Sequence, residues 1–263
     1  MTSSSGNPLG PAGAAISVGV STKMYLGYQA SLRWLAEVRS VVDARPLLGA
    51  DSEVRVFVMP SFPLLEHAGR IFDGSPVLLG AQNCSWGDGP LTGEVSPGML
   101  AELGVSLVEV GHAERRRLFA ETDAVVARKV GAALDAGLTP LLCIGEPDVL
   151  GHEAAAEFCL RQVRQAIGDN DSLLPELALA YEPVWAIGAE RPAAAGHVNA
   201  VARLLREAVG AACPILYGGS AGPGLLPALP GVDGLFLGRF AHDAANLGLV
   251  LDDALRRAEA GNA

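Results

Sequence analysis

The sequence predicts an α/β protein of the (β/α)₈ barrel class, and two observations lead to this prediction. Short apolar runs bounded by turn residues recur along the chain, which is typical of buried strands. Between them lie segments in which apolar residues return every three or four positions, which is typical of helices packed on a sheet. Strand and helix alternation implies parallel pairing through right-handed crossovers. Eight such units in 263 residues fit a closed barrel better than an open sheet.

The elements follow one another without an obvious linker. The predicted strands are Ile16–Val20, Val54–Met59, Val77–Ala81, Ser106–Val110, Pro140–Ile144, Leu177–Ala180, Pro214–Leu216 and Gly234–Leu237. The clearest helical segments are Leu26–Val42, Thr122–Ala136, Glu153–Ile167 and His197–Val209. We therefore expect one domain over residues 1–263. Residues 1–13 are rich in Ser, Gly, Pro and Ala and are expected to form a flexible N-terminal extension.

Composition and charge exclude several classes of protein. The start of the chain lacks the pattern of a signal peptide, and no stretch approaches the ~18 apolar residues of a membrane span. These features predict a soluble, cytoplasmic protein. The formal net charge of −10 argues against nucleic acid or an anionic membrane as a partner. The four cysteines show no metal-ligand spacing, so neither a disulfide framework nor a zinc site is expected.

Polar side chains follow the predicted strands at their carboxyl ends. They are Lys23, Asn83, His112, Glu114, Glu146, Glu182, Ser220 and Arg239. In a (β/α)₈ barrel these ends form one face, where the loops after the strands build the active site. The side chains are therefore expected to converge, although they are far apart in sequence.

The segment from Ala180 to Gly188 places the carboxylate of Glu182 where an apolar strand gives way to a loop. A loop that closes over a site excludes water, and this raises the basicity of a carboxylate whose ordinary pKa is about 4.3. On this segment alone, a strand-end carboxylate with a salt-bridge partner is an equal alternative. The other polar strand ends favour a catalytic base.

Several segments, taken in their order and spacing, resemble the triosephosphate isomerase family through most of the chain. They are Lys23-Met24, Gly80-Ala81-Gln82-Asn83, Thr92-Gly93-Glu94, Gly111-His112 with Glu114-Arg115-Arg116, Cys143-Ile144-Gly145-Glu146, Ala180 to Gly188, Tyr217-Gly218-Gly219-Ser220 and Val232-Asp233-Gly234 leading to Gly238. The resemblance implies a TIM barrel and an aldose/ketose isomerase that moves a proton between adjacent carbons of a small phosphorylated sugar through an enediol. It implies no metal or organic cofactor.

The resemblance also implies catalytic roles. Glu182 would be the base, and His112 would polarise the carbonyl as a neutral imidazole, because a helix N-terminus disfavours its cation. Lys23 would place a positive charge beside the developing enediolate. Glu114 would hold the Lys23 ammonium or relay a proton, the alternative being an ordinary salt bridge to an arginine.

Binding and assembly roles follow in the same way. The phosphate would rest on the backbone N–H groups of Gly188, Ser220, Gly238 and Arg239. Glu146 with Trp185 would steady a lid in its open position, and Tyr217 with Ser220 in its closed position. Thr92 lies in a segment that resembles the loop inserted into a neighbouring subunit, so a homodimer is expected.

Four departures from the family pattern cluster around the expected substrate. Ser21 replaces an Asn, Ala113 replaces a Ser, the lid reads Gly188-Ala189-Glu190-Arg191-Pro192, and Arg239 replaces the second Gly of a pair. Arg239 either grips the phosphate or a distal hydroxyl, or turns to solvent. These changes lead to the hypothesis that the substrate is a tetrulose phosphate such as erythrulose phosphate. The alternatives are an ordinary triosephosphate isomerase and a non-catalytic barrel that binds a sugar phosphate.

Overall fold

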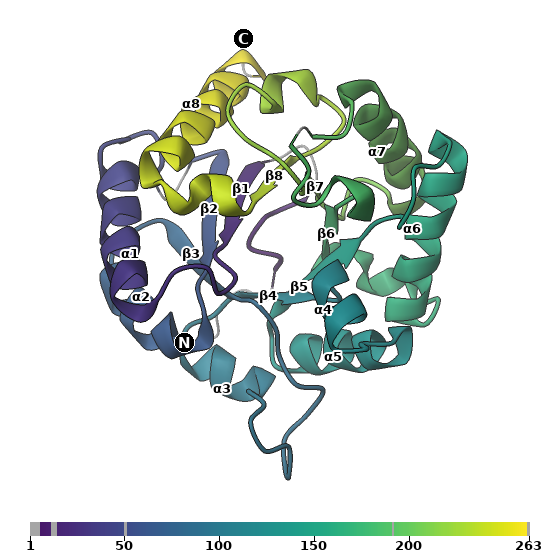
Figure 1. The fold of residues 1–263 in the computed structure, drawn as a ribbon, viewed down its shortest axis with the longest axis horizontal. Coiled ribbons are helices and arrows are strands. Elements are labelled where there is room, and N and C mark those ends of the chain that lie inside the picture. The colour runs from purple at the N-terminus through teal and green to yellow at the C-terminus, as the bar shows by residue number, and fades with distance from the viewer. Residues whose placement is uncertain (1–5, 12–14, 50–51, 191, 262–263) are drawn as a thin grey trace.

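The computed structural model describes residues 6–11, 15–49, 52–190 and 192–261. Eight parallel strands pair in chain order, and the first also pairs with the last, so the sheet closes into a barrel (Figure 1). The strands are β1 (Ile16–Ser21), β2 (Val54–Met59), β3 (Val77–Ala81), β4 (Leu107–Val110), β5 (Thr139–Ile144), β6 (Ala178–Tyr181), β7 (Ile215–Tyr217) and β8 (Gly234–Leu237). The predicted fold class is confirmed, and each predicted strand end is correct to within one residue.

Helices surround the barrel (Figure 1). They are α1 (Tyr28–Asp43), α2 (Leu65–Ile71), α3 (Pro97–Glu102), α4 (Ala113–Leu118), α5 (Asp123–Asp135), α6 (His152–Ile167), α7 (Ala195–Val209) and α8 (Ala244–Gly261). The four predicted helical segments correspond to α1, α5, α6 and α7. Thr122 caps α5, because its hydroxyl accepts the backbone N–H of Val125 at 3.3 Å. None of the helices in the described ranges is long and apolar enough to cross a membrane.

The unit after β7 differs from the others. Within the described residues it contains no α-helix, only a 3₁₀ turn at Leu226–Ala228. This stretch is rich in residues that oppose helix formation, namely Gly218, Gly219, Gly222, Pro223, Gly224, Pro227 and Pro230. The chain after β7 therefore remains an irregular loop at the rim of the barrel.

Side chains alternate between two cores along the strands. Inward-pointing residues such as Phe57, Leu107 and Phe236 fill the barrel, while their neighbours in sequence pack between the sheet and the helices. Gly19 shows how tightly the interior is filled, because a Cβ at this position would lie 1.9 Å from the ring of Phe57. The interior is thus a packed core and not a channel.

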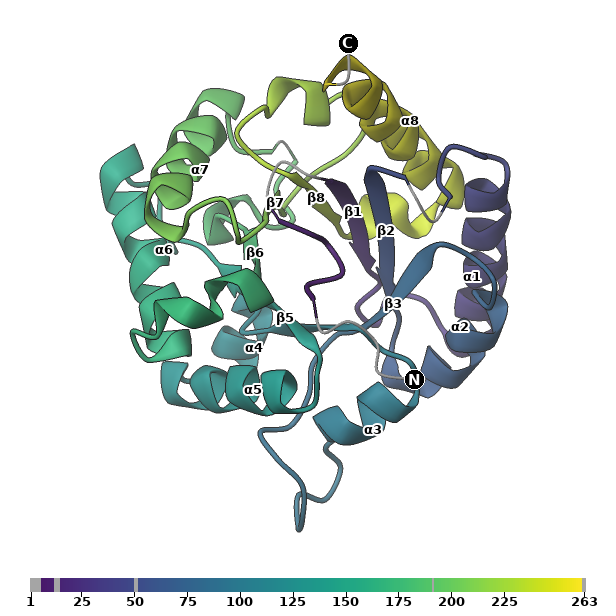
Figure 2. The same ribbon diagram turned by 180° about the vertical axis from the view of Figure 1, so that it is seen from behind.

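The N-terminal segment packs into the barrel at the end opposite the carboxyl ends of the strands. Leu9 is 1% exposed and belongs to the interior core. The Asn7 side chain donates to the carbonyl of Leu177, just before β6, at 2.8 Å. Figure 2 shows this purple segment crossing the barrel opening. Leu9 of the expected extension is therefore packed, whereas Gly6 and Pro11 are exposed, and residues 1–5, 12 and 13 lie outside the described residues.

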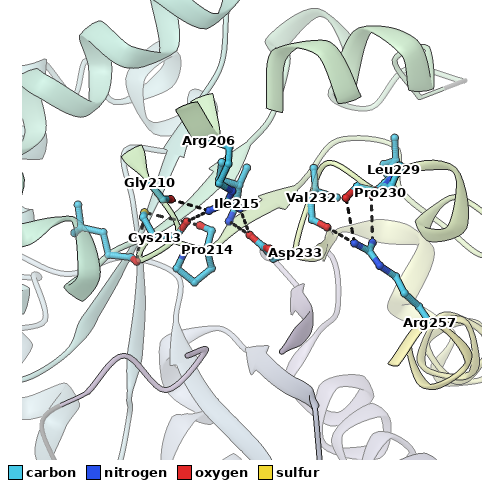
Figure 3. Close-up of polar contacts among 11 residues, drawn as sticks. Arg206, Gly210, Cys213, Pro214, Ile215, Leu229, Pro230, Val232, Asp233 and Arg257 are labelled. Atoms are coloured by element: carbon cyan, nitrogen blue, oxygen red, sulfur yellow. Dashed lines mark hydrogen bonds and ion pairs between the residues drawn. The ribbon is translucent and has the colours of Figure 1, made fainter. Parts of the chain in front are cut away.

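A polar network joins the start of β7 to the start of β8 (Figure 3). Asp233 accepts the backbone N–H of Ile215 at 2.7 Å and pairs with the guanidinium of Arg206. Arg206 also donates to the carbonyl of Cys213 at 2.6 Å. Arg257 donates to the carbonyl of Val232 at 2.8 Å, just before Asp233. These bonds satisfy backbone groups that have no partner in the sheet at this end.

Replacing Asp233 with Ala is expected to lower the free energy of unfolding by about 3 kcal/mol, because it leaves a buried N–H and a partly buried guanidinium without their acceptor. Urea unfolding at one fixed protein concentration measures this change. The control is Glu207→Ala, which breaks an exposed pair with Arg203 and should cost less than about 1 kcal/mol. Equal losses in the two variants would contradict this account.

Candidate active site

Three side chains from different strands meet at the carboxyl-end rim of the barrel. Lys23 follows β1, His112 follows β4 and Glu182 follows β6. All three line one cavity of about 30 Å³. The Nε2 atom of His112 lies 3.3 Å from Oε2 of Glu182. An ammonium, an imidazole and a carboxylate therefore surround one small space, as the sequence predicts.

Glu182 is buried between two neighbouring strands, β5 and β7, each of which is followed directly by a glycine. A Cβ on Gly218 would lie 2.3 Å from Oε1 of Glu182, and a Cβ on Gly145 would lie 1.9 Å from its backbone carbonyl oxygen. In the described residues, Oε2 of Glu182 has no hydrogen-bond partner. Burial, followed by repulsion from Glu109, raises the pKa of Glu182 to about 8. Once ionised, this carboxylate is a much stronger base than an exposed glutamate.

His112 is held as a neutral imidazole with a defined tautomer. It caps α4, and its Nδ1 atom accepts the backbone N–H of Glu114 at 3.0 Å. A proton on this ring is therefore on Nε2, which faces Glu182. Burial, followed by the nearby charge of Lys23, lowers the pKa of His112 to about 4. Burial is thus the larger cause of neutrality, and the helix N–H fixes which nitrogen donates.

The ammonium of Lys23 is held by Glu114 at 2.6 Å. Burial lowers the pKa of Lys23, but the hydrogen bond and charge of Glu114 outweigh burial, so the net shift is upward. Lys23 has a φ of 49°, in the left-handed region that is unfavourable for a residue with a Cβ. Its carbonyl accepts from Ser61 at 2.7 Å and from Gln82 at 3.1 Å, which holds this conformation. The sequence analysis assigned no role to Ser61 or Gln82, although Gln82 lies in a segment that carries the resemblance.

The expected phosphate-binding residues line a second, larger pocket of about 880 Å³. They are Gly188, Ser220, Gly238 and Arg239. This pocket adjoins the small cavity, because Lys23 and Gly238 line both. The guanidinium of Arg239 stands 5.6 Å from the ring centroid of Tyr25, and its Nη2 lies close to Gly188 of the lid. Arg239 therefore contributes to the wall of the pocket.

The loop after β6 is held by both sets of expected partners at once. Trp185 donates to Glu146 at 3.0 Å, and the hydroxyl of Tyr217 accepts the backbone N–H of Ala193 at 3.1 Å. Ser220 donates to the carbonyl of Ala189 at 2.6 Å. The partners expected for the open lid and those expected for the closed lid contact the loop together, so this structure does not distinguish the two lid positions. Arg191, part of the lid as read from the sequence, lies outside the described residues.

Two further residues near these sites have partners that the sequence analysis did not anticipate. His197 on α7 contacts Glu146 at 3.2 Å, so it shares the acceptor of Trp185. Ser21, one of the four departures, donates to the buried carboxylate of Glu109 at 2.9 Å. Glu109 was read only as part of a strand, because nothing in the sequence alone shows which face of a fully buried strand a residue occupies.

The remaining predicted positions lie outside the small cavity. Ala113, which lacks the hydroxyl of the family's Ser, lines the larger pocket. Thr92 is exposed in the loop between β3 and α3. Figure 1 shows this loop projecting from the barrel.

Comparison with known proteins agrees with this geometry. A family model described as triosephosphate isomerase matches residues 16–253. The chain is 45% identical over 248 residues to the L-erythrulose-1-phosphate isomerase of Pectobacterium atrosepticum, covering 91% of this chain and 95% of that protein. The chain belongs to the triosephosphate isomerase family. It is therefore an isomerase of a phosphorylated sugar.

Other members of the family are also similar. The chain is 39% identical over 227 residues to the triosephosphate isomerase of a Synechococcus strain, covering 84% of this chain and 90% of that protein. The crystal structure of triosephosphate isomerase from Bartonella henselae superposes with a TM-score of 0.76 at 29% identity, covering 92% of this chain and 99% of that one. Relatives named for two substrates thus share this barrel and this sequence pattern.

Replacing Glu182 with Gln is expected to stabilise the protein above neutral pH. The folded pKa of about 8 exceeds the ordinary value of 4.5, so between these pH values the folded state holds a proton that the unfolded state has lost. Stability arising from this group therefore falls as pH rises through that window. The Gln variant should exceed the wild type by a few kcal/mol at pH 8.5 and match it near pH 4.

Chemical unfolding at both pH values measures this difference. The control is Glu207→Gln at the exposed surface, which should track the wild type at both pH values. A Glu182→Gln variant that gains nothing between pH 4 and 8.5 would show that Glu182 is not desolvated as described.

Proposed function

We propose that this enzyme moves a proton between adjacent carbons of a tetrulose phosphate, with Lys23, His112 and Glu182 as its catalytic residues. The observation that carries the reaction class is the meeting of these three side chains around one small cavity. Proton transfer next to a carbonyl needs a base, a hydrogen-bond donor for the carbonyl oxygen and a positive charge for the enediolate. Each of the three residues supplies one of these functions.

The steps follow from the chemistry of a 1-phosphorylated tetrulose, which has a carbonyl at C2, a hydroxyl on C3 and a terminal hydroxymethyl group at C4. Glu182 removes the proton from C3, and the electron pair forms the C2–C3 double bond of an enediolate. The Nε2–H of His112 donates to the oxygen on C2, whose negative charge Lys23 stabilises, and its proton passes to that oxygen. Nε2 then takes the proton of the oxygen on C3, which becomes the new carbonyl as the C2–C3 double bond returns its electron pair to C2, and Glu182 gives its proton to C2.

The product of this sequence depends on chain length. In a triose phosphate the second carbon of the pair is the end of the chain, so the new carbonyl is an aldehyde. In a 1-phosphorylated tetrulose that carbon still bears the hydroxymethyl group, so the product is a second ketose phosphate. The same three residues serve both reactions, because the enediolate has the same charge in each.

The phosphate group is proposed to occupy the larger pocket. Backbone N–H groups of Gly188, Ser220 and Gly238 are suited to bind it, since glycine permits close approach. Arg239 lies in the wall of the same pocket, where its guanidinium can pair with phosphate oxygens. This arrangement supports the first of the two alternatives for Arg239.

Two observations favour the four-carbon substrate. The identity to the L-erythrulose-1-phosphate isomerase exceeds that to the Synechococcus triosephosphate isomerase, at 45% against 39%. Ser21, where the family pattern has the longer side chain of Asn, also lines the small cavity, so this departure leaves more room beside the catalytic residues. A three-carbon substrate would leave this space to water.

Steady-state assays with L-erythrulose 1-phosphate and dihydroxyacetone phosphate test the proposal. We expect kcat/KM to be at least about tenfold higher for the four-carbon substrate, since its extra hydroxymethyl group adds binding energy. Glu182→Gln serves as the control for both substrates and should lower kcat by orders of magnitude, because the base is lost. A higher value on the triose would assign the enzyme to the alternative, ordinary triosephosphate isomerase. If the wild type turns over neither substrate faster than Glu182→Gln does, and the rates do not exceed those without enzyme, the non-catalytic binding protein is favoured.

We also propose that the enzyme is a homodimer in which Thr92 of one subunit approaches Lys23 and His112 of the other. The projecting loop that carries Thr92 and the exposed apolar side chains of Met24 and Tyr25 beside Lys23 support this arrangement. Light scattering should give twice the chain mass of 27.1 kDa. Thr92→Arg should shift the mass toward the monomer, whereas Asp88→Arg, at another position of the loop, is the control. The single-chain mass for the wild type at working concentration would contradict the proposal.

A further inference from the structure

The site contains a carboxylate that the proton transfer does not use. Glu109 lies on the inner face of β4, three residues before His112, and is 4% exposed. Apart from Ser21 and the polar side chains of the candidate site, the inward-facing residues around it are apolar, as at Leu107, Leu141 and Phe236. A carboxylate among such neighbours loses its hydration, and burial raises the pKa of Glu109 to about 7. This position is therefore energetically unfavourable for a residue whose only role is to fill space.

Packing alone does not explain why a carboxylate occupies this position. A carboxylate offers about four sites for hydrogen-bond donors. In the part of the chain that the structure describes, one hydrogen bond reaches Glu109, from the hydroxyl of Ser21 at 2.9 Å. Replacing a buried charged group by an apolar side chain of similar volume is often neutral or stabilising. The remaining acceptor sites of Glu109 are consistent with a ligand that brings its own donor.

Glu109 is also placed where only one end of the substrate can reach it. It lines the small cavity together with Ser21, Lys23, His112 and Glu182, but not the larger pocket assigned to the phosphate. A strand advances about 3.3 Å per residue, so a side chain three residues before His112 lies deeper in the barrel. A substrate bound by its phosphate in the larger pocket therefore directs its opposite end toward Glu109.

The cavity that Glu109 lines is small, about 30 Å³, and Lys23, His112 and Glu182 line it too. Any carbon of the substrate beyond the reacting pair therefore lies close to Glu109. A triose phosphate ends at its reacting carbon and has no further group to place beside Glu109. A tetrulose phosphate has one additional carbon and one additional hydroxyl, whose O–H is a donor.

We propose that Glu109, oriented by Ser21, is a specificity-determining residue that accepts a hydrogen bond from the terminal hydroxyl of a four-carbon substrate. This inference rests on the proposed function and deepens it, because it names the group that distinguishes the two substrates. A buried acceptor that is built for a substrate hydroxyl discriminates against the analogue that lacks it, since the acceptor is then left unpaired or hydrated. Glu109 would thus act on binding of the distal end of the four-carbon substrate, whereas its repulsion of Glu182 acts on the base and therefore on both substrates alike.

The test compares kcat/KM on L-erythrulose 1-phosphate and on dihydroxyacetone phosphate for the wild type, Glu109→Gln and Glu109→Leu. Glu109→Leu removes the repulsion that raises the pKa of Glu182, which changes kcat on both substrates by a common factor. Beyond this factor it should lower kcat/KM on the four-carbon substrate about 50-fold relative to the triose, mainly through KM. Glu109→Gln keeps volume and an acceptor oxygen but loses the charge, so a loss of about five- to tenfold on the four-carbon substrate is expected. If Glu109→Leu fails to fold, the result with Glu109→Gln tests the assignment of Glu109.

Leu107→Met is the matched control, because it is a volume-conserving change on the same inner face of the same strand. It should alter kcat/KM on both substrates by the same factor. Thermal melting of each variant verifies that the fold is intact. An equal loss on both substrates by the Glu109 variants, or no loss on either, would overturn the assignment of Glu109.

A substrate analogue tests the hydrogen bond itself. The 4-deoxy derivative of L-erythrulose 1-phosphate lacks the terminal hydroxyl but keeps the fourth carbon. The wild type should process it at least about tenfold less efficiently than the parent substrate, and Glu109→Leu should treat the two alike. A penalty for the deoxy analogue that is as large in Glu109→Leu as in the wild type would place the partner of this hydroxyl elsewhere.

A failure of the proposed function can be distinguished from a failure of the inference about Glu109. The proposed function fails if the wild type turns over dihydroxyacetone phosphate efficiently and L-erythrulose 1-phosphate only negligibly. In that case the inference about Glu109 is overturned together with the substrate. If the wild type prefers the four-carbon substrate and the Glu109 variants keep that preference, only the inference about Glu109 fails.

Discussion

The structure of the site depends on one constraint, the burial of the Glu182 carboxylate at the rim of a closed barrel. This group lies between strand ends that approach it so closely that only glycine fits at Gly145 and Gly218. The Lys23 ammonium is paired with Glu114, and Oε2 of Glu182 faces the neutral imidazole of His112 at 3.3 Å. Glu182 is therefore buried beside an uncharged ring, and its pKa rises to about 8. Burial makes Glu182 a stronger base, and the same burial makes its ionised form costly in free energy.

The residues that stabilise the fold and the residues of the candidate site lie at opposite ends of the barrel. At the amino ends of the strands, Asp233 and Arg206 satisfy backbone groups, and Leu9 covers the interior core. At the carboxyl ends, Lys23 has an unfavourable φ, and Oε2 of Glu182 has no hydrogen-bond partner in the described residues. The sheet is rigid because it is closed, so interactions at one end can hold strain and desolvated charge at the other.

The sequence predicts the features that depend on local pattern and on chain topology. Strands were located to within one residue, because a parallel barrel buries both faces and produces apolar runs with clear ends. The meeting of Lys23, His112 and Glu182 around one cavity is predictable because barrel topology brings strand ends together. The place of Glu109 in the same cavity is not predictable, since both faces of β4 are buried and its inward direction follows only from the closed sheet. The packing of Leu9 was missed for a related reason, because a short segment rich in Gly and Pro carries no periodic signal.

The charge of the site resolves an apparent conflict between a net charge of −10 and an anionic substrate. Net charge acts over the whole surface, but beyond roughly 8–10 Å it is screened at physiological ionic strength. Within that distance the cations Lys23, Arg117 and Arg239 of the larger pocket outnumber its carboxylates, Glu114 and Glu190, and the backbone N–H groups of the lid and of the loop after β7 add donors. Glu109 and Glu182 line the small cavity with Lys23 and do not line the larger pocket. The larger pocket is therefore the part of the site that better suits the phosphate of the proposed substrate.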